Sequence, residues 1–107
     1  MKLPSPIQAY FDADRSGNGD ALIRAFAPDA VVRDEGQTHA GRPAIAAWWR
    51  DTKEKYQAVV EPLETREKGD VSTVGARVTG RFPGSPAILN FAFRLSGEQI
   101  ATLDIGV

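Results

Sequence analysis

The sequence predicts an α+β domain in which three N-terminal helices pack over the concave face of a curved, cone-shaped antiparallel β-sheet. Apolar residues recur at helical spacing as far as Tyr56, and from Gln57 onward the period changes to two. The length of 107 residues is enough to bury one hydrophobic core but not two. We therefore expect residues 1–107 to form a single domain.

The first two elements are predicted to be helices. Residues 5–6 (Ser-Pro) start the first, because Ser can cap free backbone N–H groups and Pro tolerates the first helical position. The residues that follow at helical spacing are Ile7, Tyr10, Phe11 and Asp14. The Gly-Asn-Gly run at 17–19 breaks this pattern, and a second short helix is expected from about Asp20 until Pro28 ends it.

A short strand and a third helix come next. Residues 30–34 contain a Val-Val pair, which favours a strand, and they run into a polar turn at 35–37. The third helix begins near residues 42–43 and ends at about residue 56. Its apolar stripe, at i, i+3, i+4, i+7 and i+11, consists of Ile45, Trp48, Trp49, Thr52 and Tyr56.

The second half of the sequence predicts an antiparallel meander of four strands. Alternating apolar and polar residues place them at about 57–67, 71–82, 88–96 and 99–105. Glycine-containing turns separate the strands that pair as hairpins. Pro62 cannot donate a ladder hydrogen bond, so we expect the first of these strands to lie at an edge or to carry a bulge. A coiled sheet of this kind leaves a concave face where a pocket can form.

Composition argues against several classes of partner. The 13 basic and 14 acidic residues give a net charge of -1, which predicts no binding to nucleic acid or to a membrane surface. No apolar run reaches the roughly 20 residues of a membrane span, and residues 1–6 lack the apolar core of a signal peptide, so we expect a cytoplasmic protein. The single His39, the absence of Cys and the lack of a phosphate or dinucleotide loop predict neither metal nor cofactor.

Four sequence features, in order, resemble the NTF2-like superfamily, which has a cystatin-like fold. They are I-x-x-Y in the first helix, the Gly-Asn break, A-F-A-x-D-A-V-V-R-D into the first strand, and G-R-x-A-I followed by aromatics. Within the superfamily the sequence is most similar to SnoaL-like proteins and ketosteroid isomerases, from Ile7 to Gly106. The fold hosts isomerases, cyclases, dehydratases and binding modules, so the resemblance implies the architecture more firmly than the reaction.

The resemblance to ketosteroid isomerases implies roles for individual residues. These enzymes use an aspartate base and an oxyanion hole made by a tyrosine and a protonated aspartic acid. Asp34 falls at the base and Tyr10 at the oxyanion tyrosine, whereas Phe26 and Trp49 fall where supporting tyrosines occur. Phe91 falls at the second acid. Losing one oxyanion donor costs about 100- to 1,000-fold in turnover, so Phe91 counts against steroid isomerisation.

Asp104 can replace the missing acid, depending on the register of the last hairpin. If Leu95 pairs with Glu98, then Phe91 faces Thr102 and Asp104 lies on the pocket face. A turn one residue longer would place Asp104 in solvent or at a dimer surface. Apolar alternation favours this second register and the family resemblance favours the first, and we predict the first.

The predicted site therefore has two groups of residues. Asp34, Tyr10 and Asp104 are the candidate catalytic residues. The candidate ligand-binding residues are Phe26, Val32, Trp49, Phe91, Phe93 and Thr102. Each candidate has a purely structural alternative: Asp34 can bond nearby turn amides and Tyr10 can be a core tyrosine.

Two functions follow as hypotheses. The first is a cofactor-independent isomerase, cyclase or related lyase that uses an aspartate base on a small apolar or polycyclic substrate. The second is a domain without chemistry, which binds a small apolar molecule or acts as a dimeric accessory domain. In either case the resemblance implies a homodimer that packs through the outer face of the sheet.

Overall fold

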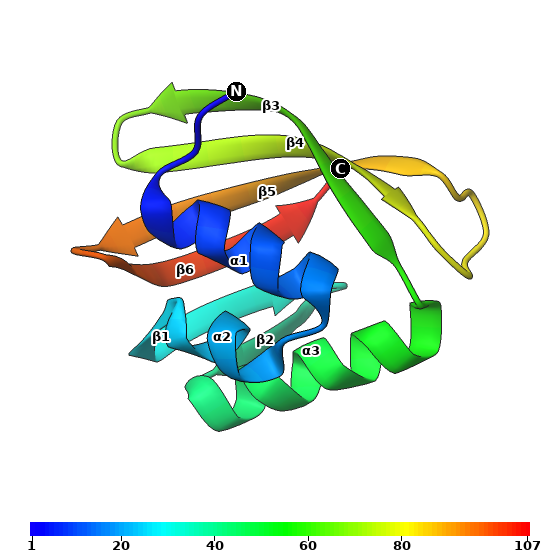
Figure 1. Ribbon diagram of the computed structural model, residues 1–107, viewed down its shortest axis with the longest axis horizontal. Helices are drawn as coiled ribbons and strands as arrows, with labels where there is room; N and C mark the ends of the chain where they lie inside the picture. Colours follow the sequence, from blue (N-terminus) through cyan, green and yellow to red (C-terminus); the bar gives the residue numbers. More distant parts are fainter.

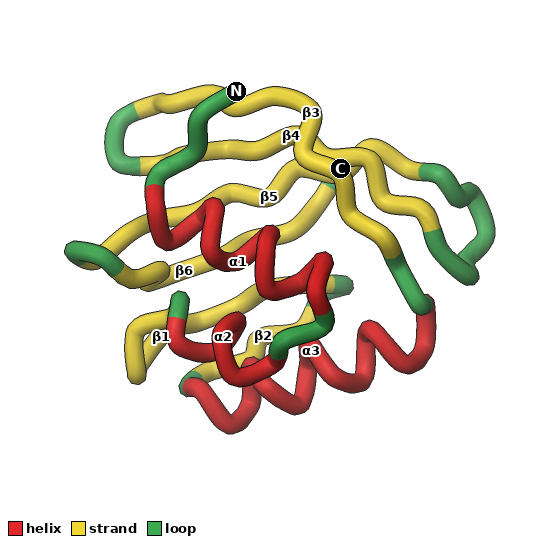
Figure 2. The backbone as a smooth tube through the Cα atoms, viewed as in Figure 1, coloured by secondary structure: helices red, strands yellow, loops and turns green.

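The computed structural model describes residues 1–107 as a six-stranded, curved and unclosed sheet with three helices over its concave face (Figures 1 and 2). The strand order is β2-β1-β6-β5-β4-β3, and every pairing is antiparallel except that of β1 with β6. The elements are α1 Ser5–Ser16, α2 Gly19–Arg24, β1 Phe26–Asp34, β2 Gln37–Ala40, α3 Arg42–Tyr56, β3 Val59–Lys68, β4 Val71–Thr79, β5 Ala87–Ser96 and β6 Gln99–Gly106. The predicted α+β class is confirmed.

The helix ends follow local backbone chemistry, with small differences from the prediction. Pro4 occupies the N-cap of α1, so Ser5 is the first helical residue and its side chain caps nothing. Gly17 ends α1 in the left-handed conformation at φ 71°, where a glycine costs least. The Asn18 side chain caps α2 by accepting from the Ala21 N–H at 3.1 Å.

The first strand is longer than predicted, and it has an extra partner. α2 ends at Arg24 rather than near Pro28, because Phe26 already pairs with Ile100 of β6 and buries its side chain completely. Glu35 and Gly36, both with positive φ, form a two-residue turn. This turn folds the unpredicted strand β2 back on β1.

The meander agrees with its predicted bounds to within a few residues. β3 lies at the edge of the sheet, and its register with β4 shifts between Pro62 and Glu64. Both expectations for the proline-containing strand are therefore confirmed.

Aromatic rings join α1 to the sheet. Tyr10 contacts the rings of Phe11, Phe26 and Phe93 with centroid separations of 5.1, 5.9 and 5.6 Å. Phe91 lies beside the same cluster, 5.5 Å from Phe11. These rings fill the concave face beneath α1, so any cavity has to lie elsewhere, towards α3.

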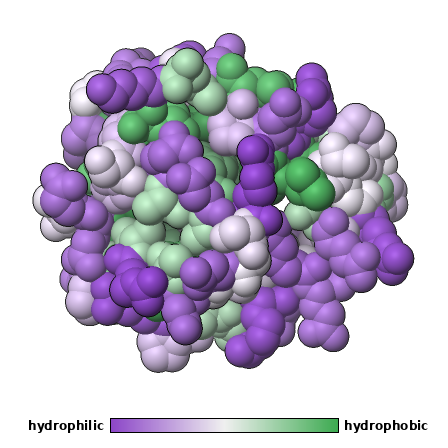
Figure 3. Space-filling model, in the orientation of Figure 1, coloured by the Kyte–Doolittle hydropathy of each residue, from purple (hydrophilic) through white to green (hydrophobic).

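Most of the surface in Figure 3 is hydrophilic, and apolar side chains show between the charged ones. None of the helices combines the length and apolar character that crossing a membrane requires.

Candidate active site

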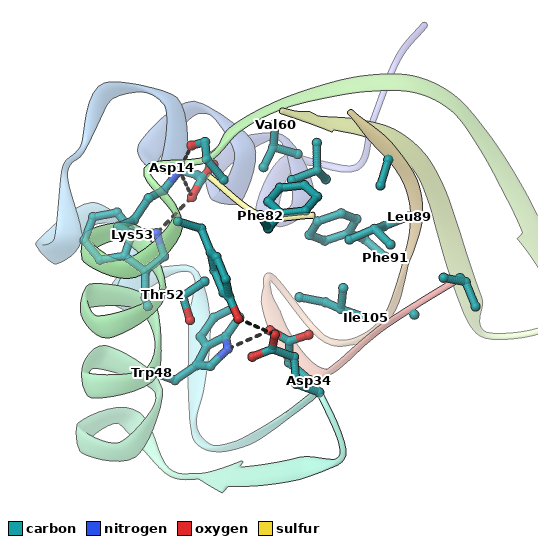
Figure 4. A pocket seen from close by; sticks show the side chains of 18 of the residues that line it. Asp14, Asp34, Trp48, Thr52, Lys53, Val60, Phe82, Leu89, Phe91 and Ile105 are labelled. Carbon is teal, nitrogen blue, oxygen red and sulfur yellow. Dashed lines mark hydrogen bonds and ion pairs between the residues drawn. The ribbon is translucent and has the colours of Figure 1, made fainter. Parts of the chain in front are cut away.

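A cavity of about 740 Å³ lies between α3 and the sheet (Figure 4). Pockets of this size hold drug-sized molecules. Most of the lining is apolar, and β3, β5 and β6 contribute Val60, Leu89, Phe91 and Ile105 to it. The polar groups in the wall are therefore few enough to be considered one at a time.

Asp34 ends β1 and its side chain lies in the wall of the cavity (Figure 4). The indole N–H of Trp48 donates to its Oδ2 at 3.0 Å. Burial raises the pKa of the Asp34 carboxyl above its ordinary value, and the charge of Glu35 adds to this, against the opposing effect of the Trp48 hydrogen bond. Asp34 is therefore a stronger proton acceptor than an ordinary surface aspartate.

Tyr10 reaches the same cavity from α1. Tyr10 is only 3% exposed, and none of the protein's side-chain hydrogen bonds involves its hydroxyl. Burial raises the pKa of the hydroxyl well above its usual value, and the charges of Asp14 and Asp34 raise it further. The hydroxyl therefore stays protonated and can donate a hydrogen bond to a bound molecule.

A second carboxylate, Asp14, is buried where α1 meets α3. Its Oδ1 accepts from the Trp49 indole N–H at 2.9 Å and pairs with the Lys53 ammonium at 3.0 Å. Lys53 also donates to the backbone carbonyl of Ala58 at 2.8 Å. We call Asp14, Trp49 and Lys53 the α1–α3 cluster, and all three line the cavity.

The two adjacent tryptophans serve different carboxylates. Neighbouring helical side chains point about 100° apart, so the two indoles reach different parts of the cavity wall. Trp48 and Trp49 both line the cavity, since one donates to Asp34 and the other to Asp14. Each indole N–H thereby fixes the orientation of one acid.

A side-chain link spans one part of the wall. The Tyr56 hydroxyl, at the end of α3, donates to Glu35 Oε1 at 2.7 Å, which ties α3 to the turn between β1 and β2. Phe82 packs edge-on against the Tyr56 ring at 6.0 Å. All three side chains line the cavity, so this link helps to shape it next to Asp34.

The family assignment rests on a direct match. The model of the SnoaL-like domain matches residues 7–102. The chain belongs to the SnoaL-like family. This confirms the resemblance found in the sequence, and a search of curated protein sequences gives no match.

Solved structures support the assignment of this SnoaL-like chain. A protein from Sinorhizobium meliloti, described as a proposed polyketide cyclase, is 48% identical, with a TM-score of 0.94 over 96% of this chain and 94% of the other. A protein of ketosteroid isomerase-like fold from Catenulispora acidiphila, in complex with trimethylamine, is 26% identical, with a TM-score of 0.84 over 99% and 87%. A computationally designed 17-OHP binder, 16% identical, shares the fold at a TM-score of 0.81 over 100% and 92%.

The predicted register of the last hairpin is wrong. In this SnoaL-like protein Phe91 pairs with Ile105, and Asp104 pairs with Ala92. A register shift near Leu95 inserts one extra residue into β6, which turns the apolar Ile105 inward. Asp104 therefore lies on the outer face, where its carboxylate pairs with Arg33 at 3.3 Å, and it does not line the large cavity.

The predicted ligand-binding residues divide into two groups. Trp49 and Phe91 line the cavity. Phe26, Val32 and Phe93 do not, because they are fully buried in the core beneath the helices. Thr102 pairs with Arg94 and also lies away from the cavity. Simple alternation places a residue on the concave face but does not show whether a helix already covers it there.

Of the α1–α3 cluster, Trp49 was predicted as part of the site, whereas Asp14 and Lys53 were not. Signals for both were present, because Asp14 follows Tyr10 by four residues on the apolar face of the first helix. Lys53 likewise follows Trp49 by four residues in the third helix. A charged residue on an otherwise buried helix face needs an oppositely charged or hydrogen-bonding partner, but spacing within the helix does not identify that partner.

Proposed function

We propose that this SnoaL-like protein is a cofactor-independent proton-transfer enzyme, an isomerase, cyclase or related lyase, that acts on a small apolar or polycyclic carbonyl compound. One observation supports this more than any other. Asp34 and Tyr10 line the same largely apolar cavity, and none of the protein's side-chain hydrogen bonds involves the Tyr10 hydroxyl. A base and a hydrogen-bond donor in the wall of one largely apolar cavity are the minimum machinery for enolisation.

The chemistry would proceed without a covalent intermediate. Asp34 takes a proton from a carbon next to the carbonyl group, so that a C–H bond breaks and a carboxyl O–H bond forms. The electron pair moves to the carbonyl oxygen, which accepts a hydrogen bond from Tyr10 as its negative charge develops. Protonation of another carbon by Asp34 completes an isomerisation. Alternatively, the enolate carbon attacks a second carbonyl of the same molecule and closes a ring, and the alkoxide that forms takes the proton from Asp34.

Phe91 narrows the range of reactions. It stands where the resemblance places a second oxyanion acid, and Asp104 does not replace that acid because it lies on the outer face. A site with one neutral donor suits a substrate whose C–H bond is already acidic, such as a carbon between two carbonyl groups. The 48% identity to a proposed polyketide cyclase supports the same choice.

A binding function is the second candidate. The absence of the second acid and the hydrogen bond that occupies Asp34 Oδ2 favour a protein that holds an apolar molecule without changing it. The designed 17-OHP binder is an instance of the same fold used for binding. The two candidates differ in one observable, which is whether a bound ketone exchanges its protons.

Deuterium exchange into 2-tetralone, an apolar bicyclic ketone, tests the proposal. In D2O at mildly acidic pH, we expect the protein to accelerate exchange at the carbons next to the carbonyl by at least about 1,000-fold over buffer, within the range that general base catalysis contributes. NMR follows the loss of the proton signals, and the rate should saturate with 2-tetralone concentration. If 2-tetralone binds but its proton exchange is not accelerated, the result would contradict the proposed enzymatic function and favour the binding function.

The partner surface proposed from the resemblance is the outer face of the sheet, packed against a second copy. The exposed apolar side chains of Val59 in β3 and Ile88 in β5 lie on this face, on either side of β4, and they support the proposal. A monomeric sedimentation coefficient at micromolar concentration would contradict it.

A further inference from the structure

The α1–α3 cluster lies across the cavity from Asp34. In Figure 4, Asp14 and Lys53 lie at one side of the cavity and Asp34 at the other, with the apolar side chains of the sheet forming a third wall. Asp14 is only 6% exposed, and the Lys53 side chain is 26% exposed. The cavity therefore has two polar sides, and the proposed chemistry uses only one of them.

The hydrogen bonds of this cluster leave one donor and one acceptor unused. A lysine ammonium carries three N–H donors; Lys53 donates one to the Ala58 carbonyl and forms an ion pair with Asp14 Oδ1 at 3.0 Å, which leaves at least one N–H free. Both of the bonds that Asp14 receives from side chains end on Oδ1, whereas no side chain donates to Oδ2. The cluster thus offers a bound molecule one N–H group and one carboxylate oxygen.

The charges of the cluster select the kind of group that fits. Asp14 and Lys53 cancel one another, and Asp34 adds a further carboxylate to the same cavity. A ligand carboxylate near Lys53 would meet the charge of Asp14 in an environment of low dielectric constant, which is costly. A neutral hydroxyl group matches both unused positions, because its oxygen accepts from Lys53 and its proton is donated to Asp14.

We propose that the cavity recognises an apolar ring compound through a neutral hydroxyl group, phenolic or alcoholic, held between Lys53 and Asp14. Its rings lie along Leu89 and Phe91 towards Asp34. This inference rests on the proposed function, since it requires that a small apolar molecule enters the cavity. Lys53 and Asp14 are then specificity-determining residues, and they place one end of the substrate while Asp34 acts at the other.

A purely structural role of the cluster makes a different prediction. If the ion pair only holds α1 against α3, its removal lowers stability and weakens every ligand alike. If it binds a hydroxyl group, its removal weakens only the hydroxylated ligand. The ratio of two affinities therefore separates the two roles, whatever happens to stability.

Three matched probes provide the test: 2-naphthol, naphthalene and 2-naphthoate, titrated against the protein while the fluorescence of its two tryptophans is recorded. We expect 2-naphthol to bind about tenfold more tightly than naphthalene, the effect of a hydrogen bond to a charged group, and more tightly than 2-naphthoate. The double variant Lys53→Met, Asp14→Asn leaves no unpaired buried charge. In it, the tenfold preference of 2-naphthol over naphthalene should fall to below about twofold.

Controls keep the outcomes distinct. Lys68→Met, at the exposed end of β3, should change neither affinity. Preference for 2-naphthol that survives in the double variant, or that disappears in Asp34→Asn instead, would overturn the inference and leave the proposed function standing. If none of the probes binds the unaltered protein, the proposed function falls with it. A melting curve and a near-ultraviolet spectrum establish that each variant is folded.

Discussion

Replacing Asp34 with asparagine is expected to lower the rate of deuterium exchange into 2-tetralone by about 1,000-fold, within the range that a general base contributes. Asparagine has nearly the same shape as aspartate, and its side-chain carbonyl can still accept the Trp48 indole N–H that now ends on Asp34 Oδ2. It cannot take up the substrate proton. Affinity for 2-tetralone should therefore change little while the saturating rate falls, and NMR gives both quantities.

Asp104→Asn is the matched control, because it makes the same chemical change to a carboxylate on the outer face. We expect its exchange rate to equal that of the unaltered protein. A similar loss in both variants would mean that general effects of charge, rather than proton transfer at Asp34, explain the result. An undiminished rate in Asp34→Asn would remove Asp34 from the proposed mechanism.

Phe93→Ala is expected to cost about 3–5 kcal/mol of unfolding free energy, measured by urea denaturation. Phe93 is completely buried, and its ring contacts those of Tyr10 and Phe11 at centroid separations of 5.6 and 5.8 Å. Truncation removes these contacts and leaves a void in the core. Because Phe93 does not line the cavity, the folded fraction should still bind naphthalene normally.

Phe91→Ala provides the contrast, since Phe91 precedes Phe93 by one strand period and does line the cavity. We expect it to weaken naphthalene binding, because the ligand loses an apolar wall. The milder Phe93→Leu serves if Phe93→Ala fails to fold. Weaker naphthalene binding by folded Phe93→Leu, with stability retained, would contradict the core assignment and restore the ligand-binding role that the sequence predicted.

Periodicity was sufficient to predict most of the fold. The apolar stripe in α3 and the alternation in β4 and β5 arise because one side of each element is buried, and burial of one side gives a periodic pattern in the sequence. β2 was missed because its four residues, Gln37–Ala40, are mostly exposed and carry no alternation. The early start of β1 depends on pairing between Phe26 and Ile100, more than 70 residues apart, and no local pattern contains that information.

The site was less predictable than the fold. Asp34 and Tyr10 were found through a family resemblance, whereas Asp104 was misplaced because one extra residue in β6 reverses the face of everything beyond it. The pairing of Asp14 with Lys53 depends on how α1 packs against α3, which spacing within either helix does not determine. The sequence therefore predicted which residue types form the site better than it predicted which side chains contact one another.

Titration of the Asp34 carboxyl carbon by ¹³C NMR tests the central claim most directly, with the Asp34→Asn spectrum to assign the signal. The claim is that Asp34 is a desolvated base in the wall of the cavity. Burial raises the pKa of this carboxyl, so we expect its midpoint to lie above the ordinary aspartate value of 3.8, and higher again when naphthalene fills the cavity and displaces water. A midpoint at or below 3.8 that naphthalene leaves unchanged would show a solvated turn aspartate and contradict the account.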